Sequence, residues 1–197
     1  ARRWATGFDF PAVAEGRVVR EEFPQDYNGR GEMVGFIPNL RREKFQDQRV
    51  REALNYAFDF EELNATVFYN QYERIDSYFF GLPFAAEGLP EGRTLEVLES
   101  VRDLVPPEVF TEPYVNPVNG DPSRLRDNLR TALGLLTEAG YTLDGNRLVD
   151  ANGTQLSFEL LMHQPTLEPI AANLQRNLGQ IGIDMQIRMV DTPQYIN

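Results

Sequence analysis

Two pairs of adjacent acids are the first candidates for acid–base chemistry in this sequence: Glu21-Glu22 and Glu61-Glu62. Neighbouring residues on a helix or strand point to different sides, so neither pair brings two carboxyl groups to one substrate atom. The sequence also lacks a Gly-x-Ser-x-Gly elbow, an HExxH zinc motif and a glycine-rich phosphate loop ending in Lys-Ser or Lys-Thr. We therefore predict that the chain is not an enzyme and has no catalytic residues. A hydrolase is the alternative, to be tested by replacing His163.

Metal and cofactor chemistry depends on Cys, His and clustered acids, which are scarce here. The sequence has no Cys and one His, His163, so thiolate catalysis, disulfides and Cys-ligated zinc are excluded. Asp144–Asn146 and Asp150–Gly153 resemble parts of a calcium loop, but the acidic ligand that should follow is absent. A hairpin turn explains these stretches better. We predict no metal site and no cofactor.

Ligand binding without catalysis is the chemistry that the aromatic residues favour. Rigid aromatic side chains in loops offer a ligand contact area and orientation. Ser77 adds a hydroxyl donor, and His163 follows a predicted strand just before a helix. Phe79 has the alternative of fastening its loop to the core, and His163 that of an ordinary loop residue. The candidate ligand-binding residues are Trp4, Phe8, Ser77, Tyr78, Phe79 and His163.

Composition is that of a soluble globular protein. Of 197 residues, 42% are hydrophobic and 25% are charged, which excludes a disordered chain. The net charge of −11 makes nucleic acid and anionic membranes poor partners. No apolar run approaches the roughly 20 residues that span a bilayer, so the chain is not expected to be membrane-spanning. The opening Ala1–Trp4 is unlike a signal peptide, and we expect an excised part of a longer protein or a processed mature chain.

The elements that position these residues are weakly marked in the first half of the chain. We expect strands at Arg17–Phe23 and Met33–Asn39, with a turn at Tyr27–Gly31 between them. Asp47 and Asp59 each begin a helix as N-cap residues, the second with capping-box spacing. The expected helices are 1–6, 48–57, 59–69 and 94–104, and an aromatic loop rich in Gly and Pro covers 71–92.

The second half has clearer periodicity. Asp121 begins a helix with a leucine-rich inner face, and Gly140 ends it. Arg147–Met162 is predicted to form a β-hairpin, Thr166–Gln180 a helix and Ile183–Val190 an alternating strand. Strand, helix and strand in this order predict a parallel pair. The fold class is therefore α/β, a mixed sheet with flanking helices.

Three stretches match a known pattern in the expected order: Phe45–Asp59, Asp121–Tyr141 and Leu174–Met185. The first is similar to F-x-D-x-R-V-R-x-A, the second to D-P-x-x-A-x-x-L-L-x-E-A-G-Y and the third to the helix-to-strand step L-x-x-I-G-I. Together they resemble the family 5 extracellular solute-binding proteins, the dipeptide- and oligopeptide-binding group of ABC importers. The resemblance covers about residues 36–197.

Shorter stretches resemble one branch of this family. Trp4–Pro11, Ser77–Phe79 and Gly88–Pro90 look like the branch associated with oligopeptide uptake, including the peptide antibiotic microcin C. The helix after Asp121 departs from the pattern, because Asn128 and Arg130 stand where the family often has smaller residues.

The resemblance implies one lobe, the C-terminal one, of a two-lobed periplasmic binding protein of type II, the Venus-flytrap form. Residues 1–197 would be a single α/β lobe, with residues 1–30 as an inter-lobe segment. The implied function is to capture an oligopeptide ligand in the periplasm by hinge closure and to deliver it to the ABC permease of the inner membrane. The remaining lobe of the same polypeptide is a further partner. A non-transport ligand-sensing or interaction module of the same fold is the alternative. The motif helices are expected to be scaffold, with Arg49 paired locally to an acid such as Asp47.

Overall fold

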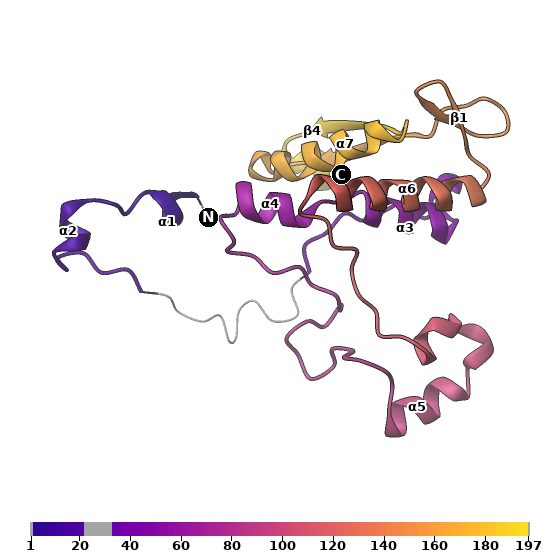
Figure 1. Ribbon diagram of the computed structural model, residues 1–197, viewed down its shortest axis with the longest axis horizontal. Helices are drawn as coiled ribbons and strands as arrows, with labels where there is room; N and C mark the ends of the chain where they lie inside the picture. The colour runs from indigo at the N-terminus through magenta and orange to yellow at the C-terminus, as the bar shows by residue number, and fades with distance from the viewer. Residues whose placement is uncertain (1, 22–32, 197) are drawn as a thin grey trace. The chain divides into compact units, whose positions relative to one another are not determined.

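A computed structural model of the chain describes residues 2–21 and 33–196 (Figure 1). The chain divides into two compact units, and each is described by itself. The first unit comprises Ala1–Gly7, Ile37–Tyr72 and Pro117–Asn197, and the second comprises Phe8–Phe36 and Glu73–Asn116. The assignment of residues 1–197 to a single lobe and of residues 1–30 to an inter-lobe segment stays a prediction.

A parallel βαβ arrangement lies at the centre of the first unit. Strand β3 (Ser157–Met162) leads through α7 (Glu168–Gln180) to β4 (Asp184–Met189), which pairs with β3 in parallel. A 3-10 turn, η4 (Pro165–Leu167), precedes α7, and α7 packs against β4 (Figure 1). The predicted parallel pair is thereby confirmed. The buried apolar side chains of α7 are Ala171, Leu174 and Leu178.

An antiparallel hairpin of two short strands precedes this arrangement. Strand β1 (Thr142–Asp144) pairs with β2 (Arg147–Val149), and Gly145 between them has a φ of 62°, in the left-handed region that such turns require. Asp144–Asn146 is thus a hairpin turn, as predicted. Within the described residues, the antiparallel and the parallel pairing form separate two-stranded sheets. The predicted α/β class is confirmed.

The hairpin predicted over Arg147–Met162 forms only next to its turn, where the backbone nitrogens of Asp150 and Leu156 donate to the backbone oxygens of Thr154 at 2.9 Å and Leu148 at 2.8 Å. Its two arms share a single bridge, Val149↔Gln155, and β3 pairs with β4 instead. Asp150 does turn the chain, because its Oδ1 accepts hydrogen bonds of 2.9 Å from the backbone nitrogens of residues 152 and 154. Beyond the turn, β3 pairs with β4 along its whole length, and α7 packs against β4.

Two amphipathic helices, α3 (Gln48–Tyr56) and α6 (Pro122–Glu138), pack against each other (Figure 1). Each begins at the predicted aspartate: Asp47 and Asp121 accept a hydrogen bond of 2.9 Å from a backbone nitrogen of the first turn. Apolar spacing at three and four residues gives each helix one buried face. The buried side chains are Val50, Ala53, Leu129, Ala132 and Leu136.

Arg49 shows how the motif helices serve as scaffold. Its guanidinium pairs with Asp47 at 2.6 Å, as predicted, and donates to the backbone oxygen of Glu138 at 2.7 Å. This guanidinium holds the pKa of Asp47 below its usual value. Arg49 therefore links the start of α3 to an exposed carbonyl at the end of α6.

The remaining helices are short. In the first unit they are α1 (Arg2–Thr6), η1 (Glu43–Phe45), α4 (Phe60–Thr66) and α8 (Thr192–Ile196). In the second unit they are α2 (Pro11–Ala14), α5 (Gly92–Glu99), η2 (Arg102–Leu104) and η3 (Pro107–Phe110). Residues 71–91 have no helix or strand, so the predicted aromatic loop is confirmed.

The two strands predicted in the first half are wrong where the chain is described. Arg17–Glu21 and Met33–Asn39 form no β-pairing, and Val34 is 80% exposed. Branched side chains stabilise a strand only when they pack on neighbouring strands, which these segments lack in the described residues. Glu22–Phe23 and the predicted turn at Tyr27–Gly31 lie outside the described residues.

Candidate functional site

Three predicted ligand-binding residues, Ser77, Tyr78 and Phe79, lie together on one loop of the second unit. The Ser77 hydroxyl oxygen accepts hydrogen bonds of 3.3 Å from the backbone nitrogens of Phe79 and Ala86. These bonds hold the loop in a tight turn with Tyr78 at its middle. They use the acceptor capacity of the hydroxyl, so its proton can still be donated to a ligand oxygen.

The rings of Tyr78 and Phe79 on this loop are exposed to solvent. Tyr78 is 76% exposed and Phe79 is 51% exposed. The Phe79 ring meets that of Phe84 edge-on, with 6.1 Å between the centroids, and Phe84 is itself exposed. The loop is therefore not fastened to a core through Phe79. Exposed rings on a hydrogen-bonded loop offer contact area to apolar groups of a ligand.

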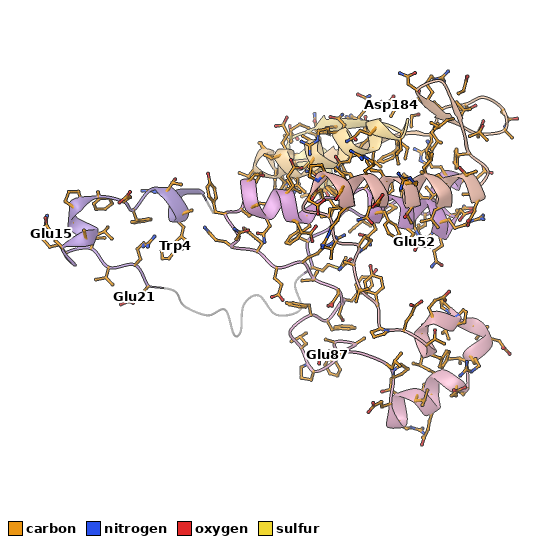
Figure 2. The ribbon with its side chains drawn as sticks, viewed as in Figure 1. Trp4, Glu15, Glu21, Glu52, Glu87 and Asp184 are labelled. Atoms are coloured by element: carbon orange, nitrogen blue, oxygen red, sulfur yellow. The ribbon has the colours of Figure 1, made fainter. Side chains whose placement is uncertain are left out.

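Trp4 and Phe8 lie close in sequence but fall in different units. Trp4 is a half-buried residue of α1 in the first unit (Figure 2). Phe8 is half-buried in the second unit, where its ring centroid lies 6.4 Å from that of Phe10.

His163 follows β3 directly and packs against α8. Its Nδ1 lies 3.4 Å from the Thr192 hydroxyl, and its ring centroid lies 4.4 Å from that of Tyr195. These contacts agree with the alternative in which His163 is an ordinary loop residue. Of the six candidates, Ser77, Tyr78 and Phe79 lie on one loop of the second unit, while Trp4 and His163 lie in the first unit.

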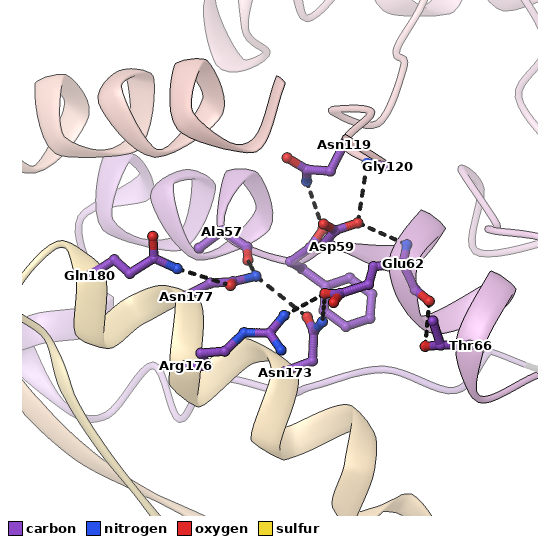
Figure 3. Close-up of polar contacts among 11 residues, drawn as sticks. Ala57, Asp59, Glu62, Thr66, Asn119, Gly120, Asn173, Arg176, Asn177 and Gln180 are labelled. Atoms are coloured by element: carbon purple, nitrogen blue, oxygen red, sulfur yellow. Dashed lines mark hydrogen bonds and ion pairs between the residues drawn. The ribbon is translucent and has the colours of Figure 1, made fainter. Parts of the chain in front are cut away.

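A polar network that the sequence did not predict joins α4, α7 and the chain around residue 119 (Figure 3). Asp59 caps α4 through its Oδ1, which accepts from the backbone nitrogens of Glu62 at 3.0 Å and Gly120 at 3.3 Å. Asn119 is 2% exposed and donates from Nδ2 to the backbone oxygen of Phe58 at 3.1 Å. Buried polar groups of this kind stabilise a fold only when each has a partner, as these have.

Glu62 connects this network to α7. Its Oε2 accepts from Asn173 Nδ2 at 2.8 Å and forms an ion pair with Arg176 (Figure 3). Its neighbour Glu61 accepts instead from the backbone nitrogen of Asn119 at 2.9 Å. The two adjacent acids therefore point to different partners, as predicted. The network positions the backbone and presents no pair of carboxyl groups to a substrate.

The sequence contains one signal for this network, the capping-box spacing at Asp59. The hydrogen bonds that join its three parts connect residues 58 to 120 positions apart, which no local pattern reveals. Asn177 is an example: it is fully buried on α7 and donates to the backbone oxygen of Ala57 at 2.9 Å. From the sequence alone it is a polar residue on an apolar face.

Two shallow hollows lie beside α6, and neither is lined by a predicted ligand-binding residue. The smaller, of about 170 Å³, is below the range of pockets that enclose a drug-sized ligand. The larger has a volume of about 480 Å³ and opens along α6 between Leu125 and Leu133. The smaller is lined by Asp59, Glu62, Gly120, Asp121, Pro122, Leu125 and Arg176.

Residues 2–21 and 33–196 contain neither a metal-binding cluster nor a membrane-spanning helix. In this part of the chain, no group of three or more His, Asp or Glu side chains is placed to hold a metal ion. No helix there is both long and apolar enough to cross a bilayer.

Residues 9–197 match the family described as bacterial extracellular solute-binding proteins, family 5 Middle. The uncharacterized protein y4wM of Sinorhizobium fredii is 54% identical over 198 residues, 100% of this chain and 30% of its own length. The probable peptide-binding protein YejA of Agrobacterium fabrum is 55% identical over 196 residues, 99% of this chain and 32% of its own. The peptidoglycan-binding protein YepA of the same organism is 38% identical over 98% of this chain and 31% of its own length. The chain thus spans 30–32% of the length of these relatives.

Solved structures share this fold. The oligopeptide-binding protein AppA from Bacillus subtilis, in complex with a nonapeptide, has a TM-score of 0.53 and 22% identity, over 80% of this chain and 26% of its own. The nickel ABC transporter from Bacillus halodurans has a TM-score of 0.53 and 26% identity, over 79% of this chain and 26% of its own. The chain therefore has the α/β fold of the type II periplasmic binding proteins.

Proposed function

Because this chain belongs to family 5 of the bacterial extracellular solute-binding proteins, we propose that it is part of a longer protein that captures oligopeptides in the periplasm for an ABC importer. The observation that carries the proposal is the loop on which the Ser77 hydroxyl holds Tyr78 and Phe79 exposed. A protein that accepts many peptides needs aromatic contact area for varied side chains and hydrogen bonds for the invariant backbone.

The names of similar proteins support the same class of ligand. Two relatives are named for binding peptide or peptidoglycan, and AppA holds a nonapeptide. Nickel, which the Bacillus halodurans protein is named for, is a weaker proposal for this chain, because it has one His and no Cys to supply nitrogen and sulfur ligands.

Capture in this proposal follows from hinge closure. The remaining two thirds of the polypeptide supply the second lobe, and a peptide between the lobes favours the closed form because it contacts both. The closed protein then docks on the permease of the inner membrane. One lobe alone offers part of the contacts while the ordering costs of binding remain, so this chain by itself should bind peptides weakly or not measurably.

Replacing Tyr78 in the full-length protein tests the proposal. Tyr78→Ala removes an exposed ring from the loop, and we expect the dissociation constant for an oligopeptide mixture in calorimetry to rise about tenfold or more. The matched control is Leu104→Ala, which truncates an 83% exposed side chain outside the loop. Equal affinities for wild type and both variants would remove the loop from the binding site.

The alternative of a sensing or interaction module without transport makes a different prediction. Such a module would bind its ligand without requiring a permease. Peptide uptake by living cells distinguishes the two. Loss of uptake when the gene is deleted, and its recovery when the full-length protein is restored, would support transport.

A further inference from the structure

The segment Glu73–Asn116, which carries the exposed aromatic loop, leaves the first unit after Tyr72 and returns to it at Pro117. Asn64 on α4 holds the departing chain, because its Oδ1 accepts from the backbone nitrogen of Tyr72 at 3.1 Å and its Nδ2 donates to the backbone oxygen of Tyr72 at 2.8 Å. One side chain thus satisfies both backbone groups of the last residue before the segment, as a neighbouring strand would.

The chain between α4 and Tyr72 is strained. Tyr69 and Asn70 have φ values of 56° and 57°, in the left-handed region that residues other than glycine rarely adopt. The backbone nitrogen of Asn70 donates to the backbone oxygen of Asn64 at 2.7 Å, and the Phe68 ring lies 4.5 Å from that of Tyr72. Consecutive residues in this conformation persist only when their surroundings hold them there, and they are enriched at functional sites.

The returning chain is held on the same helix. The backbone nitrogen of Asn119 donates to Glu61 Oε2 at 2.9 Å, one turn before Asn64 on α4. The buried Asn119 side chain donates to the backbone oxygen of Phe58, and its Oδ1 accepts from Asn128 Nδ2 at 2.9 Å. Asn128 Nδ2 also donates to the backbone oxygen of residue 118 at 2.9 Å.

Asn128 therefore holds the returning chain on α6. It stands on α6 where the family helix often has a smaller residue, and a smaller side chain could not reach the returning chain in this way. Gly120 fits the same arrangement: its φ is 89°, and a Cβ there would lie 3.0 Å from that of Glu61. Within the second unit, Asn116 Nδ2 donates to the backbone oxygen of Ile75 at 3.0 Å, so the two ends of the segment are also joined there.

We infer that Asn64 on α4, Asn128 on α6 and Asn119 on the returning chain form an asparagine clamp, which fixes the first-unit chain at both ends of the aromatic segment and so favours ligand binding by that segment. They are positioning residues: they hold the backbone at both ends of the segment and leave the ligand contacts to the loop. The ligand role rests on the proposed function. A segment whose ends are fixed before binding loses less conformational freedom when a peptide orders it, which favours affinity.

Hydrogen exchange of the full-length protein tests the clamp apart from the ligand. Asn64→Ala and Asn128→Ala remove half-buried side chains and leave the fully buried Asn119 in place. We expect backbone amides of residues 74–88 to exchange about tenfold faster in both variants, while those of β4 remain unchanged. Asn152→Ala is the matched control, because Asn152 is an exposed asparagine of a remote turn.

The conservative variant Asn64→Asp separates positioning from loss of a side chain. It keeps the acceptor for the Tyr72 nitrogen and loses the donor to the Tyr72 oxygen, so we expect an increase in exchange between those of wild type and Asn64→Ala. Exchange equal to that of the control in both alanine variants would overturn the clamp. Faster exchange over β4 as well would also overturn it, because the effect would then be general destabilisation.

Peptide affinity is the second readout. We expect the dissociation constant for an oligopeptide mixture to rise about fivefold or more in both alanine variants, since the segment must then be ordered on binding. Faster exchange with unchanged affinity would overturn the positioning role. If wild type binds no peptide, the proposed function fails, and faster exchange confined to residues 74–88 still supports the clamp.

Discussion

Adding a single methyl group at Gly182 should destabilise the protein strongly. It has a φ of 81°, and a Cβ there would lie 2.6 Å from the backbone nitrogen of Leu148 and 2.9 Å from the backbone carbon of Arg147. The oxygen of Gly182 also accepts from that same Leu148 nitrogen at 2.9 Å. The glycine of the family's I-G-I step is therefore the contact between the α7–β4 turn and β2.

The free-energy cost of Gly182→Ala has two parts. Placing an alanine in the left-handed conformation costs about 1–2 kcal/mol. Moving the β2 backbone out of the way adds about 1–3 kcal/mol, the usual range for an extra methyl group in a packed site. We therefore expect Gly182→Ala to lose about 2–5 kcal/mol in local stability. Only the cost of moving the β2 backbone depends on the close approach of Gly182 to β2.

Gly140→Ala is the matched control, because Gly140 has a φ of 95° and a Cβ there would meet no atom within 4 Å. It should lose only the conformational part. Hydrogen exchange of β4 amides in the full-length protein measures both, with tenfold faster exchange for each loss of about 1.4 kcal/mol. If both variants accelerate exchange equally, the close approach to β2 contributes nothing and the reasoning is refuted.

Two further predictions concern the capping aspartates. Asp59→Ala leaves the backbone nitrogens of Glu62 and Gly120 without their acceptor, so the free energy of unfolding should fall by about 2 kcal/mol in urea titration; an unchanged midpoint would contradict the network. Because Arg49 lowers the pKa of Asp47 in the folded protein, the stability that Asp47 contributes is complete above its ordinary pKa of about 3.9 and is lost as the pH falls through the lowered value. In Asp47→Asn, the free energy of unfolding should therefore decrease less steeply with falling pH below about pH 4. The same pH dependence in variant and wild type would exclude the Asp47–Arg49 pair as a source of acid sensitivity.

Local signals predicted the helices well. Asp47, Asp59 and Asp121 begin their helices as expected, because an N-cap is a contact between residues two or three positions apart. Gly140 ends α6 with the positive φ that a terminating glycine supplies. The parallel pair of β3 and β4 followed from the order strand, helix, strand.

Pairings between distant residues were not predictable in this way. The turn at Asp150 has the chemistry of a hairpin, yet its arms share the single bridge Val149↔Gln155, and β3 pairs along its length with β4, which follows it by more than twenty residues. The network at Asn119 depends on partners about sixty positions away, so its residues carry no local pattern in the sequence. Ser77, Tyr78 and Phe79 lie on one loop because they are neighbours in the sequence, and their role in ligand binding stays a prediction.

Scanning calorimetry of the full-length protein, with and without an oligopeptide mixture, tests the central proposal most directly. Ligand at about 100 times its dissociation constant adds about 2.7 kcal/mol to the stability of the native state. We predict that peptides raise the unfolding temperature of the full-length protein and leave that of residues 1–197 alone unchanged. No shift of the full-length protein with peptides, or a shift with nickel in their place, would contradict the proposal that this protein captures oligopeptides.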